Sequence, residues 1–339
     1  MSLPERMRAW RVVVHGPPTD ALRLHEVPVP SPGPGQVLLR VAATALNFPD
    51  VLLAAGQYQV RPPLPFTPGI EGCGEVVAVG EGVEGSLVGQ RVLGMLALPH
   101  GGLAEYALAP AHCVHPAPAV LDDDAAAALY VGHQTAWFAL HRRAAVRAGE
   151  TVLVHAAVSG VGSATVQLAR AAGARVVGVV GGAEKVEVAQ SLGYDDVVDR
   201  RAHDDLVPAL REVLGRHGAD VVVDPVGGPA YDASTKVVAF EGRIVVVGFT
   251  SGRFAQAATN HVLVKNYSVL GLHWGMYQER DPTAVRECHE RLCALAASGE
   301  VRPLVSGRVP LSGARDALVE VAAGRTTGRV VVRPGEVET

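Results

Sequence analysis

The hydrophobic pattern changes character along the chain. Before about residue 120, short apolar runs such as 7–14 and 36–46 are separated by turns rich in glycine and proline. Many turns between short strands indicate a partly open β-barrel. From residue 151 onward, Val-rich runs alternate with amphipathic segments. This alternation predicts parallel strands that are covered by helices on both faces of a sheet.

The α/β segment is predicted to be an insertion. Residues 122–146 precede it and have a helical composition, with an acidic start that suits a helix N-terminus. A predicted helix at 283–299 and closing strands follow it. The strands expected within it are 151–156, 174–180, 195–199, 219–226 and 242–249, and the helices are 161–173, 183–193, 202–218 and 229–240.

A candidate dinucleotide-binding loop follows the first strand of the insertion. In the usual fingerprint, three glycines make the turn, admit the pyrophosphate and allow close helix packing. Here Ala157, Ser159 and Gly162 take those places, and Gly160 and Val161 lie between them. Because the loop joins a strand to a helix within a series of β/α units, we predict that it binds a dinucleotide. The alternative is an α/β protein whose tight turn binds nothing.

The end of the next strand indicates NADP(H) rather than NAD(H). NAD sites carry an acid about 20 residues after the glycines, but this chain has Gly181 and Gly182 there. A carboxylate would repel the 2′-phosphate of NADP, whereas two glycines leave room for it. Lys185 can neutralise that phosphate, and Arg200 can cover the phosphate or the adenine. Alternatively, Lys185 is an ordinary solvated helix residue.

Composition narrows the functional classes. The 339 residues carry a net charge of −4 and contain no run of basic residues, so nothing favours nucleic acid or a membrane surface as the main partner. The four cysteines are scattered. No uninterrupted apolar run is long enough to cross a bilayer, and the first residues lack a signal-peptide core. We expect a cytoplasmic protein. Nearly all basic residues are arginine, which we interpret as genome composition.

Four motifs carry a resemblance to a known family: NFPD at 47–50, PFTPGIEGCGEVVAVG at 65–80, AAVSGVG at 156–162 and TTGRVVV at 326–332. With them, the chain resembles the medium-chain dehydrogenase/reductase superfamily. Within it, the chain is similar to the zinc-independent NADPH:quinone oxidoreductases, which include zeta-crystallin. The resemblance implies a GroES-like partly open β-barrel with an inserted Rossmann-type doubly wound parallel sheet. The expected boundaries are 1–123 for the first part of the GroES-like catalytic domain, 124–267 for the Rossmann domain and 268–339 for the return to the catalytic domain.

The resemblance also implies that the chain binds no metal. Aligned on the motifs, Asn47 and Ile70 stand where zinc alcohol dehydrogenases have a Cys and a His ligand. Asparagine and isoleucine cannot supply the tetrahedral nitrogen and sulfur set that zinc requires. Glu71, which zinc enzymes keep near the metal, is expected to be a structural hydrogen-bond acceptor.

The implied activity is hydride transfer from NADPH to a quinone or an α,β-unsaturated carbonyl compound. The catalytic candidates are Asn47, as a partner for a carboxamide or carbonyl group, and Tyr58, as a hydroxyl or stacking surface. The alternative for Tyr58 is an aromatic ring that only packs on the barrel. Leu52 replaces a tyrosine that is frequent in quinone reductases, which weakens the case for simple quinones. Further cofactor-binding positions implied by the family are Thr135, Gly248, Phe249 and Arg325.

Two other functions are alternatives to this activity. One is an enoyl-thioester reductase of the same superfamily, which needs a basic pocket for coenzyme A phosphates. The other is a crystallin-like protein that binds NADPH and RNA. The expected partners are a small-molecule substrate and further copies of the chain, because 263–275 resembles the edge strand through which these enzymes form dimers. A homodimer or homotetramer is expected, with Trp274 and Tyr277 facing either the substrate or the partner.

Overall fold

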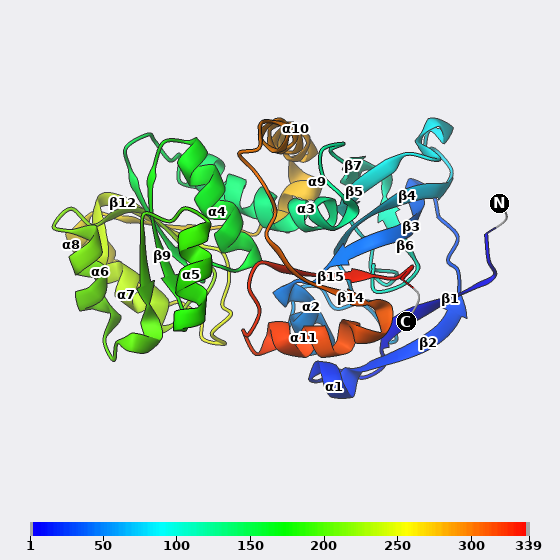
Figure 1. Cartoon of the computed structure of the whole chain (residues 1–339), viewed down its shortest axis with the longest axis horizontal. Helices are drawn as coiled ribbons and strands as arrows, with labels where there is room; N and C mark the ends of the chain where they lie inside the picture. Colours follow the sequence, from blue (N-terminus) through cyan, green and yellow to red (C-terminus); the bar gives the residue numbers. More distant parts are fainter. Residues whose placement is uncertain (1–2, 337–339) are drawn as a thin grey trace. The chain divides into compact units, whose positions relative to one another are not determined.

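The computed structural model describes residues 3–336, which fold into two compact units (Figure 1). The first, here called the barrel unit, is built from the chain up to Val131 and again from Arg302 onward. The second, the Rossmann unit, is the continuous stretch Gly132–Val301. The chain therefore has the predicted organisation, an α/β unit inserted into a β-rich one.

A seven-stranded sheet forms the barrel unit. Its longest strand, β3 (Gln36–Ala45), pairs antiparallel with β4 (Glu71–Val79), β6 (Tyr106–Pro110) and β15 (Arg329–Arg333). The remaining strands are β5 (Arg91–Met95), β7 (Val114–Pro116) and β14 (Val305–Pro310). A separate antiparallel ribbon is formed by β1 (Arg6–Val12) and β2 (Leu22–Pro28). Because β14 and β15 lie in the C-terminal stretch, both stretches of chain are needed to complete the sheet.

Short helices cover an apolar cluster beside this sheet. α11 (Ala314–Ala322) packs against α1 (Pro18–Ala21) and α2 (Phe48–Ala54), as Figure 1 shows. The cluster includes Leu22, Phe66 and Leu318, which have no exposed surface. Burying side chains of this size stabilises the fold by about 1.5 to 3 kcal/mol each. The cluster therefore fixes α2, which begins directly after Asn47.

The Rossmann unit contains a six-stranded, fully parallel sheet with the order β10-β9-β8-β11-β12-β13. The chain starts in the middle at β8 and proceeds first to one side and then to the other. Ligands of such sheets bind at the carboxyl ends of the strands next to this reversal, which lies between β8 and β11. The strands are β8 (Thr151–His155), β9 (Arg175–Val180), β10 (Asp196–Asp199), β11 (Ala219–Asp224), β12 (Val238–Val246) and β13 (Ser268–Gly271).

Helices connect these strands. α3 (Asp123–Trp137) leads into the unit and ends in a π-helical turn at Phe138–Arg143. None of the helices in residues 3–336 combines the length and the hydrophobicity needed to cross a bilayer. The others are α4 (Gly160–Ala171), α5 (Ala183–Ser191), α6 (Leu206–Leu214), α7 (Pro229–Val237), α8 (Thr259–Lys265), α9 (Tyr277–Arg280) and α10 (Pro282–Ser298).

Each strand and helix predicted in the α/β segment is present, with ends that differ by a few residues. The unit boundaries, at 131/132 and 301/302, lie later than the expected 123/124 and 267/268. The reason is β13, which pairs in parallel with β12 and keeps the following chain in the Rossmann unit. The pattern also gave no indication of α2 or α8, which have only seven residues each.

Candidate functional site

The loop between β8 and α4 has the backbone of a phosphate-binding turn. Ala156 adopts a positive φ of 50°, an unfavourable conformation for a residue with a Cβ atom. Ser159 is the N-cap of α4, and its Oγ accepts a hydrogen bond from the Gly162 backbone N–H at 3.1 Å. A Cβ atom added at Gly162 would lie 2.4 Å from the Ala156 carbonyl oxygen. Gly162 is therefore the one fingerprint position at which only glycine fits.

Tyr194 holds this loop in place through hydrogen bonds from its hydroxyl. No sequence signal indicated this role. Its hydroxyl lies 2.9 Å from the carbonyl oxygens of both Ala157 and Gly162. The side chain is buried, and burial raises the pKa of its hydroxyl well above the ordinary value. A Cβ atom at Gly178 would collide with the ring at 2.9 Å, so a glycine in β9 makes room for it. The loop is thereby held at its first and its last fingerprint position.

Cationic groups surround the two glycines at the end of β9. A Cβ atom at Gly181 would lie 3.0 Å from Nε of Arg200, so this guanidinium lies over the glycine. Lys185 is in the first turn of α5 and is half-buried. Burial lowers its pKa, as do the charges of Arg200 and Arg201, while Glu184 raises it. The structure thus brings Arg201 to the two predicted cations, although no sequence signal singled it out.

Two carboxylates also lie at this place. Asp199 Oδ1 accepts hydrogen bonds from the backbone N–H groups of Gly182, at 2.8 Å, and of Arg201, at 2.9 Å. The Glu184 carboxylate lies against Gly182, where an added Cβ would be 2.4 Å from its oxygens. The carboxylates of Asp199 and Glu184 therefore lie close to the position where the fingerprint acid is missing. The cations around the two glycines, Lys185, Arg200 and Arg201, outnumber these two acids.

Asp224, at the carboxyl end of β11, is a second residue that the sequence analysis missed. It is fully buried, and its Oδ1 accepts the N–H groups of Val226 and Gly227 at 2.8 and 2.9 Å. The Gly248 N–H approaches its carbonyl oxygen at 3.4 Å. Asp224 therefore fixes the turns after β11 and β12, where the predicted cofactor residue Phe249 packs edge-on against Phe254.

The remaining predicted cofactor residues lie in different surroundings. Thr135 is buried within α3. Arg325, in the barrel unit, is exposed and forms two hydrogen bonds with Glu320, at 2.7 and 2.6 Å. To bind a phosphate, Arg325 has to exchange this partner, so its cofactor role stays a prediction.

In the barrel unit, Asn47 belongs to a buried polar cluster. Its Nδ2 donates to Glu71 Oε1 at 2.8 Å and to the Ala45 carbonyl oxygen at 3.0 Å, and its Oδ1 accepts from Arg329 Nη1 at 2.7 Å. Arg329 also forms an ion pair with Glu71, which accepts the Val131 N–H at 2.7 Å. Burial lowers the pKa of Arg329 to about 10. Glu71 thus has the acceptor role predicted for it.

These contacts limit what Asn47 can do. Both of its amide hydrogens are used, so it has no N–H left for a substrate carbonyl or oxyanion. Its Oδ1 retains one lone pair, which can accept the N–H of a carboxamide. The side chain is 4% exposed. These contacts give Asn47 a positioning role within the cluster, and its contact with the cofactor or the substrate stays a prediction.

Asp50 anchors the same segment. It is fully buried, and its carboxylate accepts backbone N–H groups from Asn47 at 2.9 Å, Gly69 at 2.9 Å and Ile70 at 3.2 Å. Burial raises the pKa of Asp50 to about 6, against the lowering effects of these hydrogen bonds and of Arg329. One carboxyl group therefore joins the start of α2 to the chain before β4.

The stability of the protein is expected to depend on pH through Asp50. Its pKa is higher in the folded chain than the ordinary value near 4, so folding takes up a proton between about pH 4 and pH 6. The free energy of unfolding, compared with that of Asp50→Asn, should fall by about 2 to 3 kcal/mol as the pH rises from 4 to 7. Urea denaturation at four pH values measures this difference. With the exposed Asp316→Asn as control, a pH-independent difference would contradict the prediction.

The three aromatic candidates, Tyr58, Trp274 and Tyr277, lie in different surroundings. Tyr58 is partly buried and packs against the apolar cluster of the barrel unit. Trp274 is buried in the Rossmann unit, where its Nε1 donates to Gln134 Oε1 at 3.3 Å, and the Tyr277 ring packs at a tilt of 54° against Phe138. β13 lies at the edge of its sheet, as the predicted dimer contact requires. Trp274 therefore has a structural partner within its own unit, and the oligomeric state stays a prediction.

The residues at the aligned zinc positions do not fit a metal. The Asn47 amide is engaged by Glu71 and Arg329, and Ile70 is a buried hydrocarbon side chain without a donor atom. His115 is buried, and its Nε2 lies 3.0 Å from the Tyr130 hydroxyl. Within residues 3–336, no three His, Cys, Asp or Glu side chains group together as metal ligands. The side chains at the two aligned positions therefore offer zinc no ligands.

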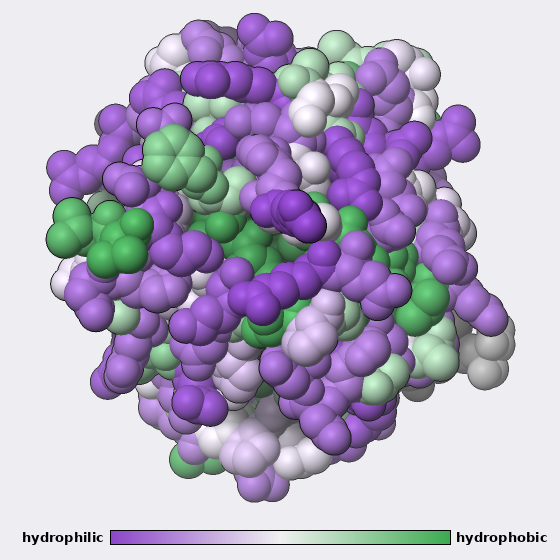
Figure 2. All heavy atoms as spheres, turned by 90° about the vertical axis from the view of Figure 1, so that its left-hand side faces the viewer, coloured by the Kyte–Doolittle hydropathy of each residue, from purple (hydrophilic) through white to green (hydrophobic). Residues whose placement is uncertain are grey.

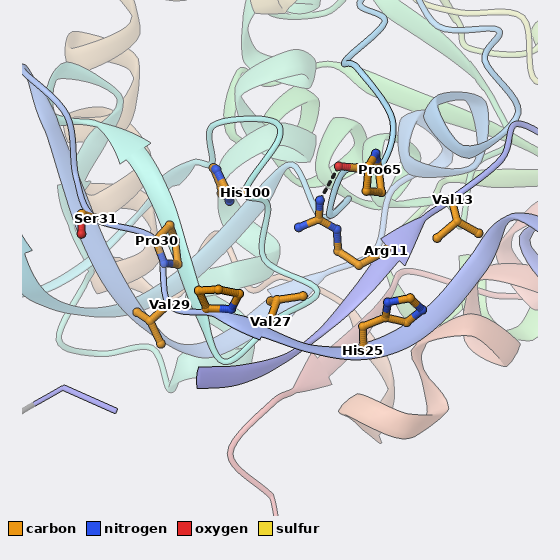
Figure 3. A pocket seen from close by; sticks show the side chains of 10 residues that line it. Arg11, Val13, His25, Val27, Val29, Pro30, Ser31, Pro65 and His100 are labelled. Carbon is orange, nitrogen blue, oxygen red and sulfur yellow. Dashed lines mark hydrogen bonds between the residues drawn. The ribbon is translucent and has the colours of Figure 1, made fainter. Parts of the chain in front are cut away.

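The barrel unit also has a shallow apolar pocket of about 500 Å³ along the β1–β2 ribbon (Figure 3). Arg11 points into it and donates from Nη2 to the Pro65 carbonyl oxygen. Val13, Val27 and Val29 supply much of the apolar lining. None of the predicted site residues lines this pocket.

Comparison with known proteins agrees with both units. Residues 33–119 match the alcohol dehydrogenase GroES-like domain family, and residues 160–290 match the zinc-binding dehydrogenase family. A quinone oxidoreductase-like protein 2 homolog from Nematostella vectensis is 35% identical over 302 residues, which cover 88% of this chain and 82% of the relative. A mycobacterial structure complexed with NADPH has 31% identity and a TM-score of 0.89 and covers 97% of this chain and 100% of its own. A segment of the phthioceranic/hydroxyphthioceranic acid synthase of Mycobacterium tuberculosis is 35% identical over 309 residues, which are 91% of this chain but 14% of that synthase.

A parallel sheet with a glycine turn at its point of reversal, inserted into a GroES-like barrel, defines a nucleotide-dependent dehydrogenase or reductase. With these relatives, the chain belongs to the medium-chain dehydrogenase/reductase superfamily, in its quinone oxidoreductase family. It is an oxidoreductase that binds NADPH. The predicted family, fold class and cofactor are confirmed.

Proposed function

We propose that the protein reduces quinones or α,β-unsaturated carbonyl compounds with NADPH and without a metal. The observation that carries this proposal is the buried cluster around Asn47. Where zinc relatives are expected to hold their first metal ligand, this chain has an amide that is bound to Glu71 and to the Arg329 guanidinium. Without a Lewis acid to polarise an ordinary carbonyl, the suitable substrates are those that are already electrophilic.

NADPH supplies the hydride when it is bound. The β8–α4 loop, with Ser159 and Gly162, would hold the pyrophosphate at the N-terminus of α4. Lys185 and Arg200 would hold the 2′-phosphate beside Gly181. The substrate accepts the hydride at carbon, and the negative charge that develops on its oxygen is neutralised by a proton from solvent. The residues of the chain orient the two reactants and stabilise that oxygen.

Tyr58 is the proposed donor to this oxygen. Burial raises the pKa of its hydroxyl, and the Asp50 carboxylate raises it further. The hydroxyl therefore stays protonated at neutral pH and can donate a hydrogen bond. Asn47 is proposed to accept from the nicotinamide carboxamide and to hold α2, and with it the chain that leads to Tyr58.

Tyr58→Phe is expected to lower kcat about tenfold for an enone and less for a quinone, with a smaller change in KM. Hydride addition to an enone creates an enolate that needs stabilisation, whereas the quinone product is already a stabilised phenolate. Steady-state kinetics with both substrates measures the difference, and Tyr106→Phe, on β6 of the same unit, is the control. Unchanged kcat for both substrates would leave Tyr58 as a packing residue.

An enoyl-thioester reductase is the second candidate, because a segment of the phthioceranic/hydroxyphthioceranic acid synthase covers 91% of this chain at 35% identity. NADPH oxidation should be measured with a quinone, an enone and an enoyl thioester, each before and after prolonged chelation. The proposal predicts turnover of the quinone or the enone, unaffected by the chelator. Higher kcat/KM for the thioester would favour the second candidate. Loss of activity that zinc restores would contradict the metal-free mechanism.

A further inference from the structure

The Rossmann unit has a second hollow, of about 640 Å³, that no part of the proposed function uses. It lies where α6, α7 and α8 end, next to the beginnings of β11 and β12. The strands are parallel, so this is the edge of the sheet opposite to the carboxyl ends, where the β8–α4 loop and Asp224 lie. A six-residue strand such as β11 spans about 20 Å. The hollow is therefore separate from the cofactor loop.

Four cationic side chains line the hollow, and no carboxylate does. Arg211, Lys236 and Lys265 are each in the last turn of a helix, and Arg216 is in the loop after α6. Among residues 3–336, none of the four has an acid within ion-pair distance. Lys265 Nζ donates to the Thr235 carbonyl oxygen at 3.0 Å. Burial lowers the pKa of Lys265, and the charges of Lys236 and Arg211, which line the same hollow, lower it further.

The helix ends do not balance these charges. Cations in a last turn are favoured by the helix dipole, which explains why each of them is there. A helix end carries about half a negative charge at most. Three ends leave about two and a half positive charges uncompensated, in a chain whose net charge is −4. Mutual repulsion at this place is a cost that an anionic ligand removes.

The backbone is shaped to keep the cations together. Gly218 has a φ of +89°, and a Cβ atom there would lie 2.3 Å from the Val237 carbonyl oxygen. This close contact holds the loop that carries Arg216 against the end of α7, which carries Lys236. Glycine is therefore required where β11 and β12 begin to pair, with Ala219 opposite Val238, and this pairing brings the two cation-bearing segments together.

The distribution of lysine points to the same place. Of the 30 basic residues that are Lys or Arg, the sequence contains only three lysines, at 185, 236 and 265. The genome composition that favours arginine elsewhere has left lysine at the predicted NADPH phosphate site and twice in this hollow. A lysine ammonium is a compact, strongly hydrated point charge that binds phosphate from several directions.

An aromatic ring completes the lining. Phe240, at the start of β12, is 70% exposed. Figure 2 shows the side of the Rossmann unit that carries α8 and β12 in Figure 1, where hydrophilic residues predominate and apolar residues are exposed between them. An exposed ring beside cations suits a ligand that has a flat ring as well as charge.

We propose that this hollow is a second nucleotide site, which binds a small ligand with two or more phosphate groups. Its phosphates would contact Lys236, Lys265, Arg211 and Arg216, and its base would stack on Phe240. Two to three negative charges, as in a nucleoside diphosphate, match the uncompensated positive charge. The site does not rest on the proposed function, because none of the residues assigned to the reductase chemistry lines it.

The three lysines allow a direct test on the NADPH-saturated protein. A limiting amount of an amine-reactive reagent is added with ADP, pyrophosphate or adenosine at constant ionic strength, and peptide mass spectrometry quantifies each lysine. ADP and pyrophosphate are expected to lower the labelling of Lys236 and Lys265 at least threefold, while Lys185, covered by NADPH, does not change further. No protection, or equal protection of all three lysines, would overturn the proposal.

Calorimetric titration of ADP into the same complex provides the second test. Lys236→Gln/Lys265→Gln should weaken ADP binding at least tenfold and leave NADPH binding intact, which also shows that the variant is folded. Arg286→Gln/Arg291→Gln removes two charges from exposed positions of α10 and is the matched control. If the control weakens binding equally, or if a single-stranded oligonucleotide binds far more tightly than ADP, the small-ligand site is excluded. If the wild-type protein did not bind NADPH at all, that result would instead refute the proposed function.

Discussion

Replacing Arg329 with methionine is expected to lower the free energy of unfolding by about 3 to 5 kcal/mol, which is the cost of leaving a buried charge without its partner. Arg329 is 6% exposed, and its guanidinium contacts Asn47 and Glu71, which is fully buried. Methionine fills much of the same volume, so the loss reports on charge more than on packing. Urea denaturation of the two proteins measures the difference.

A double variant separates the effect of the unpaired Glu71 charge from the effect of losing the Arg329 side chain. In Arg329→Met/Glu71→Gln the uncompensated carboxylate is gone, and this double variant should recover at least 1 kcal/mol relative to Arg329→Met alone. Arg308→Met, whose partner Asp124 keeps a second cation in Arg333, should cost much less. If the double variant is the less stable of the two Arg329 variants, the stabilisation does not arise from the ion pair.

Gly181→Asp is expected to weaken NADPH binding by about 100- to 1000-fold and to leave NADH binding within about threefold. The new carboxylate would lie against Arg200, whose Nε is 3.0 Å from the position of the added Cβ. It would neutralise this cation and repel the 2′-phosphate. A lost charge-assisted hydrogen bond and a new repulsion together amount to about 3 to 4 kcal/mol. Fluorescence titration with both cofactors measures the two affinities.

Gly181→Asn provides the matched control, because asparagine has the same size without the charge. Steric effects alone predict equal losses for the two variants and for the two cofactors. The proposed phosphate site predicts a loss that is confined to NADPH and much larger for aspartate. Equal weakening of NADH and NADPH by Gly181→Asp would therefore contradict the assignment of the 2′-phosphate to this place.

The sequence predicted those parts of the fold that depend on local pattern. The Val-rich runs became β8, β9, β10, β11 and β12, because a strand buried on both faces has to be apolar at nearly every position. The loop at Ala157–Gly162 was also recognisable from local pattern, because its small residues follow a strand and open a helix. The missing acid at Gly181 and Gly182 then predicted NADP(H), and the comparisons confirm that cofactor.

The polar groups that hold the site together could not be predicted in this way. Asn47 and Arg329 are separated by 282 positions, and their contact exists only because β15 pairs with β3. Tyr194 reads as an ordinary residue after a helix, and its contact with the loop depends on the glycine opposite it in β9. Charge counting along the chain likewise found no basic cluster, since Arg211, Lys236 and Lys265 come from the ends of three helices.

The bond between Tyr194 and the loop has a thermodynamic consequence for cofactor capture. A flexible glycine loop has to be ordered when its ligand arrives, and that loss of entropy is subtracted from the affinity. Here a buried hydroxyl holds the carbonyls of Ala157 and Gly162 before any nucleotide is present. Ordering this loop should therefore subtract less from the NADPH binding free energy than ordering a flexible loop would. A tyrosine outside the motif thus adds rigidity to a turn that carries only one of the three customary glycines.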